Sequence, residues 1–315
     1  MEPFSPQHIG EGDVVYRVLL VHACSLTRLG GAELGLCHHL EHAPAGVQVD
    51  VITPGEPRDL SPYDAVVLAN LRPEGGLGEQ AEAAWAIEWT RRLSRYRGLA
   101  IRSEHDLHPC IHRDGRCLTG YPVRKLPCDC PPLIRRSFEE LYNACAAVQF
   151  LSPAHQQAIN SLIRLAGRQF VIASPVDLVQ FRSVIPLQER EPVALITGDE
   201  LRVSGTAEDR ARRGGYRPLR VPYLSVPYKE MPALYNRCQA VVVDPVMFHA
   251  FGRIAVEALA CGCRLLASDR VGALSWPDPL EATRCANEEF WNMVQGKWRS
   301  VRDSEMLSPG YAPSR

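Results

Sequence analysis

The chain has 315 residues and a formal net charge of −1, with 46% hydrophobic and 23% charged residues. Its length exceeds the usual size of a single domain and predicts two domains of roughly 150 residues each. The ordinary globular composition excludes a long disordered protein, and the near-neutral charge gives no reason to expect an obligate nucleic-acid partner.

The N-terminal residues carry no sign of a targeting signal. Met1–His8 lack both the basic start and the apolar core of a signal peptide. No apolar run approaches the roughly 18 residues that a membrane-spanning helix requires. We therefore expect a cytoplasmic protein without a transmembrane segment, in which the 11 cysteines are thiols or metal ligands rather than disulfides.

The first half of the chain alternates apolar strands with amphipathic helices. Helices are predicted from Gly30 to Leu40, from about Gly78 to Arg97 with Gly98 as the cap, around Ile134–Cys145, and from the N-cap pair Ser152-Pro153. Strands are predicted at Tyr16–Ala23, Val47–Thr53, Tyr63–Asn70, Leu99–Ile101, Ala147–Leu151 and Phe170–Ala173. Such alternation predicts an α/β fold with a doubly wound parallel sheet.

A second, shorter α/β series follows the polar linker Pro186–Pro192. It has strands at Val193–Thr197, Ala240–Val243 and Cys263–Ser268, helices at Met231–Arg237 and Arg253–Ala260, and a terminal helix that contains Phe290 and Val294. The predicted domains are therefore 1–185, with a Cys-rich loop at 108–132, and a smaller second domain at 186–285. The terminal helix and tail at 286–315 are expected to cross back to the first domain.

The segment Phe251–Cys263 contains the most informative residues of the chain. It places a glycine-bearing loop and a short helix directly after the apolar run Ala240–Val243, which reads as a buried strand. Backbone N–H groups at the start of such a helix bind anions. Glu257, one and a half turns into the helix, is placed to reach a hydroxyl beside the anion. A phosphate with a ribose diol suits this arrangement, although an ordinary βα unit has the same pattern.

These residues also resemble the donor site of retaining glycosyltransferases of family 4, which have two Rossmann-like domains facing a cleft (the GT-B fold). Phe251-Gly252 and Glu257–Gly262 match the family motif, and Glu257 stands where the family has the second of two glutamates, which holds the donor ribose. The resemblance implies a UDP- or GDP-sugar donor contacted by His249, Ala250, Phe251, Gly252 and Glu257. No catalytic metal is expected, because helix N-termini and cations can offset the leaving-group charge.

Two elements of the first half extend the resemblance. Gly30-Gly31, followed by Ala32-Glu33, matches the family's Gly-Gly-x-Glu loop, whose small residues let the backbone approach the donor phosphates. His105-Asp106 matches the His-Asp element at the cleft. The resemblance implies that His105 contacts the sugar or positions the acceptor, while Asp106 orients its ring. A structural histidine is the alternative for His105.

The sequence departs from the family at two places. His249 replaces the first glutamate of the motif, and the Lys-Gly that grips the donor diphosphate is missing, since there is no lysine between Lys125 and Lys229. The leading interpretation is a glycosyltransferase that moves a sugar to an acceptor hydroxyl. The alternatives are a non-catalytic nucleotide-sugar-binding or assembly module, and an enzyme that modifies a nucleobase or protein side chain.

A cysteine cluster follows His105-Asp106. Cys110, Cys117, Cys128 and Cys130 fall in an irregular, proline-flanked segment, where thiolates at this density suit a structural Zn²⁺ ion. Their spacing is not that of a standard zinc knuckle. An iron–sulfur cluster or four thiols in a surface loop are the alternatives.

Overall fold

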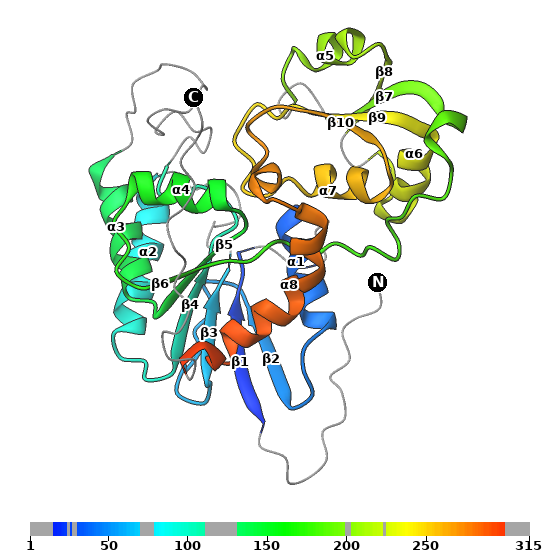
Figure 1. Ribbon diagram of the computed structural model, residues 1–315. Helices are drawn as coiled ribbons and strands as arrows, with labels where there is room; N and C mark the ends of the chain where they lie inside the picture. Colours follow the sequence, from blue (N-terminus) through cyan, green and yellow to red (C-terminus); the bar gives the residue numbers. More distant parts are fainter. Residues whose placement is uncertain are drawn as a thin grey trace.

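The computed structural model describes residues 15–23, 26, 30–69, 79–110, 131–198, 203–222 and 225–299. In these ranges the chain forms two parallel β-sheets, one of six strands and one of four, each covered by helices. Figure 1 shows the larger sheet below and the smaller sheet above it. The predicted α/β fold with a smaller second half is confirmed.

The first sheet has the strand order β2-β1-β3-β4-β5-β6, with all strands parallel. The residues of β3, β4 and β5 are buried on both faces, as expected for apolar strands covered by helices on each side. The strands are β1 (Tyr16–Val21), β2 (Val47–Ile52), β3 (Ala65–Leu68), β4 (Leu99–Ser103), β5 (Ala147–Phe150) and β6 (Arg168–Val171).

The helices of this half lie on both faces of the sheet. Helices α2 (Glu79–Leu93) and α3 (Pro132–Asn143) pack together on one side, and α4 (Pro153–Leu162) connects β5 to β6. On the other side, α1 (Gly31–Glu41) packs against α8 (Pro279–Val294), which comes from the far end of the chain (Figure 1). The hydroxyl of Tyr16 on β1 donates a hydrogen bond to the carbonyl of Val294, 2.9 Å away, at the end of α8.

The second sheet has the order β10-β9-β7-β8, again all parallel. Its strands are β7 (Glu191–Thr197), β8 (Arg217–Val221), β9 (Cys238–Val243) and β10 (Arg264–Ala267). Its helices are α5 (Ala207–Arg213), α6 (Met231–Arg237) and α7 (Arg253–Ala260), and its 3₁₀ turns are η1 (Leu187–Glu189), η2 (Tyr228–Glu230) and η3 (Gly272–Ser275). A further 3₁₀ turn, η4 (Lys297–Arg299), follows α8 and contacts β6 through Trp298 and Phe170. The boundary proposed between residues 185 and 186 falls in the connection from β6 to β7.

Strand order reverses once in each sheet. The first sheet reverses beside β1, which lies between β2 and β3, and the second beside β7, which lies between β9 and β8. Open α/β sheets bind ligands at such points, outside the carboxyl ends of the strands. The two sheets therefore have one expected ligand position each.

The second helix of the first half ends earlier than expected. The structure ends α2 at Leu93, not at Arg97. A turn follows, in which the Ser94 hydroxyl donates to the Arg91 carbonyl and the Tyr96 hydroxyl donates to the Tyr63 carbonyl at 2.9 Å. Tyr96 thus belongs to the packing between the helix and β3 without being helical. Helical spacing alone does not distinguish a residue inside the helix from one in the following turn that packs on the same face.

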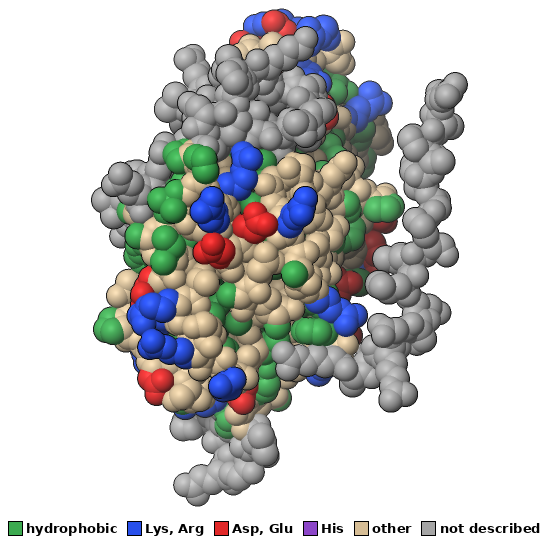
Figure 2. Space-filling model, turned by 90° about the vertical axis from the view of Figure 1, so that its left-hand side faces the viewer, with side chains coloured by type: hydrophobic (Ala, Val, Ile, Leu, Met, Phe, Trp, Pro, Cys, Tyr) green, Lys and Arg blue, Asp and Glu red, His purple; other side chains and the backbone are tan. Residues whose placement is uncertain are grey.

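The surface over α2, α3 and α4 carries mixed charge. Figure 2 shows Lys and Arg side chains interspersed with Asp and Glu among the described residues of this face. This distribution agrees with the net charge of −1. None of the helices in the described part of the chain is long and apolar enough to cross a membrane.

Candidate functional site

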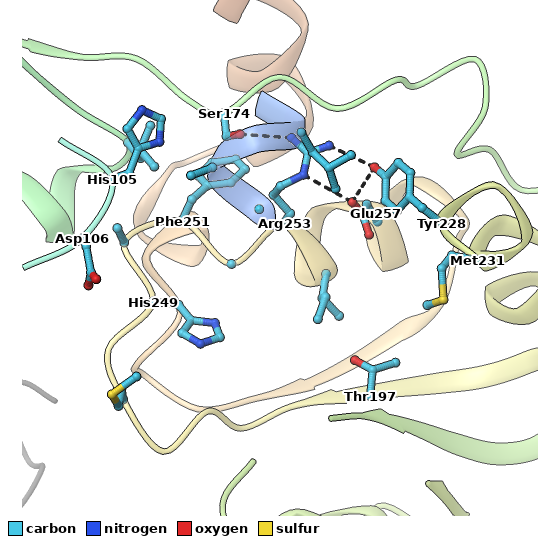
Figure 3. Close-up of a pocket in the computed structure, with 18 of the residues that line it drawn as sticks. His105, Asp106, Ser174, Thr197, Tyr228, Met231, His249, Phe251, Arg253 and Glu257 are labelled. Atoms are coloured by element: carbon cyan, nitrogen blue, oxygen red, sulfur yellow. Dashed lines mark hydrogen bonds and ion pairs between the residues drawn. The ribbon is translucent and has the colours of Figure 1, made fainter. Parts of the chain in front are cut away.

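A cavity of about 390 Å³ lies between the two sheets, at the carboxyl ends of their strands. Thr197 at the end of β7 and Val221 at the end of β8 line one wall, and the loop after β9 lines another. His105 and Asp106, just beyond β4, approach from the first sheet, as Figure 3 shows. Both ligand positions expected from the strand orders therefore open into one cavity.

The cavity brings together most of the site residues that the sequence suggests. Its lining includes Gly31, His105, Asp106, His249, Ala250, Phe251, Gly252 and Glu257. Gly30 is not among the lining residues but forms the N-cap of α1 directly beside them. The two halves of the chain contribute to the same space although their site residues are more than a hundred positions apart in sequence.

The loop from His249 to Gly252, called here the donor loop after the family motif that it resembles, has a fixed backbone. Gly252 is the N-cap of α7 and has a φ of 84°, in the left-handed region that favours glycine. A Cβ atom there would also lie 2.8 Å from Cγ1 of Val271. The His249 N–H donates to the Arg270 carbonyl at 2.9 Å, and the Gly272 N–H donates to the His249 carbonyl at 2.9 Å. The first turn of α7 consequently faces the cavity in one orientation.

Glu257 is buried on α7, with only 3% of its surface exposed. Its carboxylate accepts hydrogen bonds from the Tyr228 hydroxyl at 2.9 Å and from the Tyr235 hydroxyl at 3.2 Å. Burial, with the carboxylate of Glu257 as the next cause, raises the pKa of both tyrosines, which stay protonated donors. The carboxylate is therefore held rigidly at the cavity wall, where it can accept further hydrogen bonds from a ligand.

Arg253 is a site residue that the sequence analysis did not single out. Its Nε lies 3.5 Å from Oε1 of Glu257, one helical turn away. Nη2 donates to the Tyr228 hydroxyl at 3.0 Å, and Nη1 donates to the Ser174 hydroxyl at 3.1 Å and to the Pro175 carbonyl. Figure 3 shows this chain of contacts from Ser174 to Glu257. Arg253 therefore ties α7 to the segment that follows β6 in the first half.

The charge of the cavity wall is low. Among the described residues, Arg253 is the only lysine or arginine that lines it. The hydroxyl of Thr197 has no hydrogen-bond partner among the described atoms, and Figure 3 shows Thr197 among the residues that line the cavity. A buried hydroxyl of this kind costs free energy unless something bonds to it, so it is a candidate ligand contact.

His105 lies at the cavity wall and is neutral. Burial, followed by the nearby His22, lowers the pKa of its imidazole well below the ordinary value. Its Nε2 lies 3.0 Å from the Ser103 hydroxyl, which in turn donates to Gln149 at 2.5 Å. The Asp106 carboxylate accepts from the Leu107 N–H at 2.9 Å. Ser103 thus holds the His105 ring, a role that the resemblance gives to Asp106.

A buried ionic network supports the turn at His105. The Arg102 guanidinium and the Glu104 carboxylate are fully buried and pair at 2.7 Å. Glu104 also accepts from the Tyr142 hydroxyl and contacts His108, and its Oε1 accepts from the Asp106 N–H at 2.9 Å. Burial opposes ionisation of Glu104, but Arg102 and His108 hold its pKa well below the ordinary value. The network fixes where the chain turns after β4.

The glycine pair of the first half lies next to a second buried pair. Nε2 of His22, just after β1, lies 2.9 Å from Oε1 of Glu33 on α1. A Cβ atom on Gly31 would lie 3.6 Å from Cδ of Arg253. The start of α1 therefore approaches α7 closely, and glycine at position 31 leaves that space open.

The cysteine cluster is only partly within the described residues. Cys110 is fully buried, and its N–H donates to the Leu107 carbonyl at 2.8 Å. Cys117, Cys128 and Cys130 lie outside the described residues, and the described part of the chain contains no group of three or more metal-ligating side chains. The zinc site stays a prediction, which elemental analysis of chelator-free protein tests.

No protein-family model and no curated protein sequence matches the chain, whereas solved structures do. Sucrose-phosphate synthase from Thermosynechococcus elongatus is similar over 90% of both chains, with 16% identity and a TM-score of 0.55. Anabaena HepE, in complex with UDP and glucose, is similar over 91% of this chain and 100% of its own, with 12% identity and a TM-score of 0.54. The chain has a GT-B fold.

A GT-B fold accounts for the position of the cavity between two Rossmann-like halves. Another HepE structure, in complex with UDP-glucose, covers 89% of this chain at 14% identity, with a TM-score of 0.54. Identities this low establish the fold alone. The activity of the chain therefore has to be argued from its own residues.

Sequence reasoning could have found Arg253 from its position. It directly follows Gly252 and precedes Glu257 by four residues, which places the two side chains on one face of a helix. Ser174 and Pro175 gave no such signal, because their contact with Arg253 joins positions almost 80 residues apart.

Proposed function

We propose that this protein is a glycosyltransferase that moves a sugar from a nucleoside-diphosphate donor to an acceptor hydroxyl with retention of configuration. The observation that carries the proposal is the buried Glu257 carboxylate on the helix that follows the donor loop, facing a cavity between two parallel sheets. The HepE structures with UDP and UDP-glucose support a uridine nucleotide as the first donor to test.

Each side of the cavity has a role in this proposal. Glu257 accepts hydrogen bonds from the ribose hydroxyls, and the N–H groups at the start of α7 meet the diphosphate. Gly31 lets the first half approach the same phosphates. His105, which is neutral, contacts the sugar or the acceptor. The bond from the anomeric carbon to the diphosphate oxygen breaks and the nucleoside diphosphate leaves. A bond from that carbon to the acceptor oxygen forms, and the acceptor proton passes to the departing diphosphate.

The leaving diphosphate carries negative charge that the site must offset. The α7 N-terminus supplies partial positive charge, and Arg253 lies in the same helical turn. The guanidinium of Arg253 is already bound to Ser174, Pro175 and Tyr228. A guanidinium with these partners is less available to offset the charge of the leaving diphosphate. This favours a second candidate function, in which the protein binds a nucleotide sugar without transferring it.

Titration calorimetry with UDP tests the binding step. Replacing the carboxylate in Glu257→Gln keeps the size of the side chain but removes a charge-assisted contact, which is worth about 1.5–3 kcal/mol. We expect the variant to bind UDP roughly 10-fold to 150-fold more weakly. Glu281→Gln on the exposed surface of α8 is the matched control and should bind as the wild type does.

Turnover of UDP-sugars separates the two candidate functions. Release of UDP from a donor, with water or an added acceptor, supports the transferase. Tight UDP binding without turnover of any donor supports the binding module. Equal UDP affinity of the wild type and Glu257→Gln would contradict the assignment of the donor site, on which both candidate functions depend.

A further inference from the structure

The first turn of α4 lies between two parts of the cavity wall that belong to different sheets. The N-cap Ser152 and His155 in this turn both have fully buried side chains. Neither side chain lines the cavity. Each instead hydrogen-bonds a backbone carbonyl of a segment that does.

Ser152 connects the helix to the donor loop. As the N-cap of α4 its Oγ accepts from the His155 N–H at 3.1 Å, and its hydroxyl donates to the Ala250 carbonyl at 2.7 Å. The neighbouring Ala154 N–H donates to the Ser275 hydroxyl at 3.0 Å. A Cβ atom on Gly272 would collide with both Ser152 and Ala250. The helix and the donor loop are thus in close contact.

His155 connects the same helical turn to the turn that carries His105. Its Nδ1 accepts from the Leu151 N–H at 3.3 Å, so the ring proton is on Nε2. That Nε2–H donates to the Asp106 carbonyl, 2.8 Å away. Burial lowers the pKa of His155, which keeps the ring in this neutral form. The ring packs between Phe150 and Phe248, with centroids at 5.6 and 6.3 Å.

We infer that Ser152 and His155 are positioning residues that set the separation between the donor loop and the His105–Asp106 turn. One helical turn holds one carbonyl from each half of the chain. A rigid element therefore fixes the distance between the His105–Asp106 turn and the donor loop. This inference rests on the proposed function for its catalytic consequence. Misplacing reacting groups by about 1 Å costs roughly a hundredfold in rate.

Hydrogen exchange tests the geometry without any activity. Ser152→Ala removes both the helix cap and the bond to Ala250, whereas Asp278→Ala removes only the cap of α8. A hydrogen bond contributes about 0.5–1.5 kcal/mol, so Ser152→Ala should speed amide exchange in peptides covering 249–254 roughly threefold to tenfold. Asp278→Ala should leave these peptides unchanged. Unchanged exchange in Ser152→Ala would overturn the inference.

Kinetics then tests the consequence. Ser152→Ala and His155→Phe, which keeps a ring between Phe150 and Phe248, should each lower kcat about tenfold or more. Their Kd for UDP should stay within about threefold of the wild type. Ser152→Thr, which keeps the hydroxyl, should have a kcat close to that of the wild type. Equal kcat in Ser152→Ala and Asp278→Ala contradicts the inference. If wild type binds UDP without turnover, the proposed transferase fails while the exchange result still decides the geometry.

Discussion

At the scale of single residues, His105 is distinguished by its low basicity at the cavity wall. Burial and His22 keep its pKa well below the ordinary value, so it is neutral throughout the physiological range. A neutral imidazole acts as a hydrogen-bonding group toward a sugar or an acceptor. It does not act as a cation toward phosphate.

His105→Ala should therefore lower kcat about a hundredfold while changing the Kd for UDP much less, because the lost contact is at the sugar or acceptor. His42→Ala, at the exposed C-cap of α1, is the control. Between about pH 6 and 8, His105 should contribute no ionisation to the rate. The pH–rate profiles of the wild type and His105→Gln should therefore have the same shape in this range. A variant that is less stable but fully active per folded molecule would show that His105 is structural.

Individual site residues differ in how far the sequence revealed them. Glu257, Gly252 and the donor loop could be predicted, since glycine, helix and acid follow one another within nine residues. The hydroxyls of Tyr228 and Tyr235 and the contacts of Arg253 could not. They depend on how α6 and the segment after β6 pack against α7, which local pattern does not encode.

At the scale of elements, α8 is anchored to α1 through a histidine. His39 is stacked on Phe290 with ring centroids 3.9 Å apart, and its Nδ1 lies 2.9 Å from Oδ1 of Asn287. The Trp291 indole donates to the His39 carbonyl at 2.8 Å. Burial lowers the pKa of His39 to about 3. The two helices therefore pack best when this ring is neutral.

This packing predicts a stability that falls in acid. Between pH 6.5 and about 3 the unfolded chain binds a proton at His39 that the folded protein does not. The free energy of unfolding should decrease by up to about 1.4 kcal/mol per pH unit in that window. Denaturant melts from pH 7 to 5 should show a smaller decrease in His39→Gln. Equal pH slopes of the free energy of unfolding in the wild type and His39→Gln would contradict the assignment.

Strands with apolar runs or alternating apolar residues could be predicted, whereas β8 was missed. Ala240–Val243 reads as a buried strand and is the core of β9. In β8, Arg217 and Arg220 interrupt the apolar residues, and the strand lies at the edge of the sheet, where its residues are exposed or half-buried. Helix α5, with three arginines in its last turn, gave no apolar stripe to detect.

At the scale of the whole molecule, the two halves are joined by polar contacts around the cavity. Arg253 reaches Ser174, Ser152 reaches Ala250, and the Trp276 indole donates to the Leu151 carbonyl at 3.1 Å. Helix α8 adds a contact with α1, on the face of the first sheet opposite to α2 and α3. The two-domain organisation could be predicted from length and the repeated strand–helix pattern, but none of these contacts could.

The central claim is that Glu257 holds the ribose of a nucleotide donor in the cavity between the sheets. A crystal structure of the complex with UDP tests it most directly. We predict both ribose hydroxyls within about 3.2 Å of the Glu257 carboxylate and the diphosphate at the first turn of α7. UDP bound outside the cavity, or inside it with the ribose away from Glu257, would contradict the account.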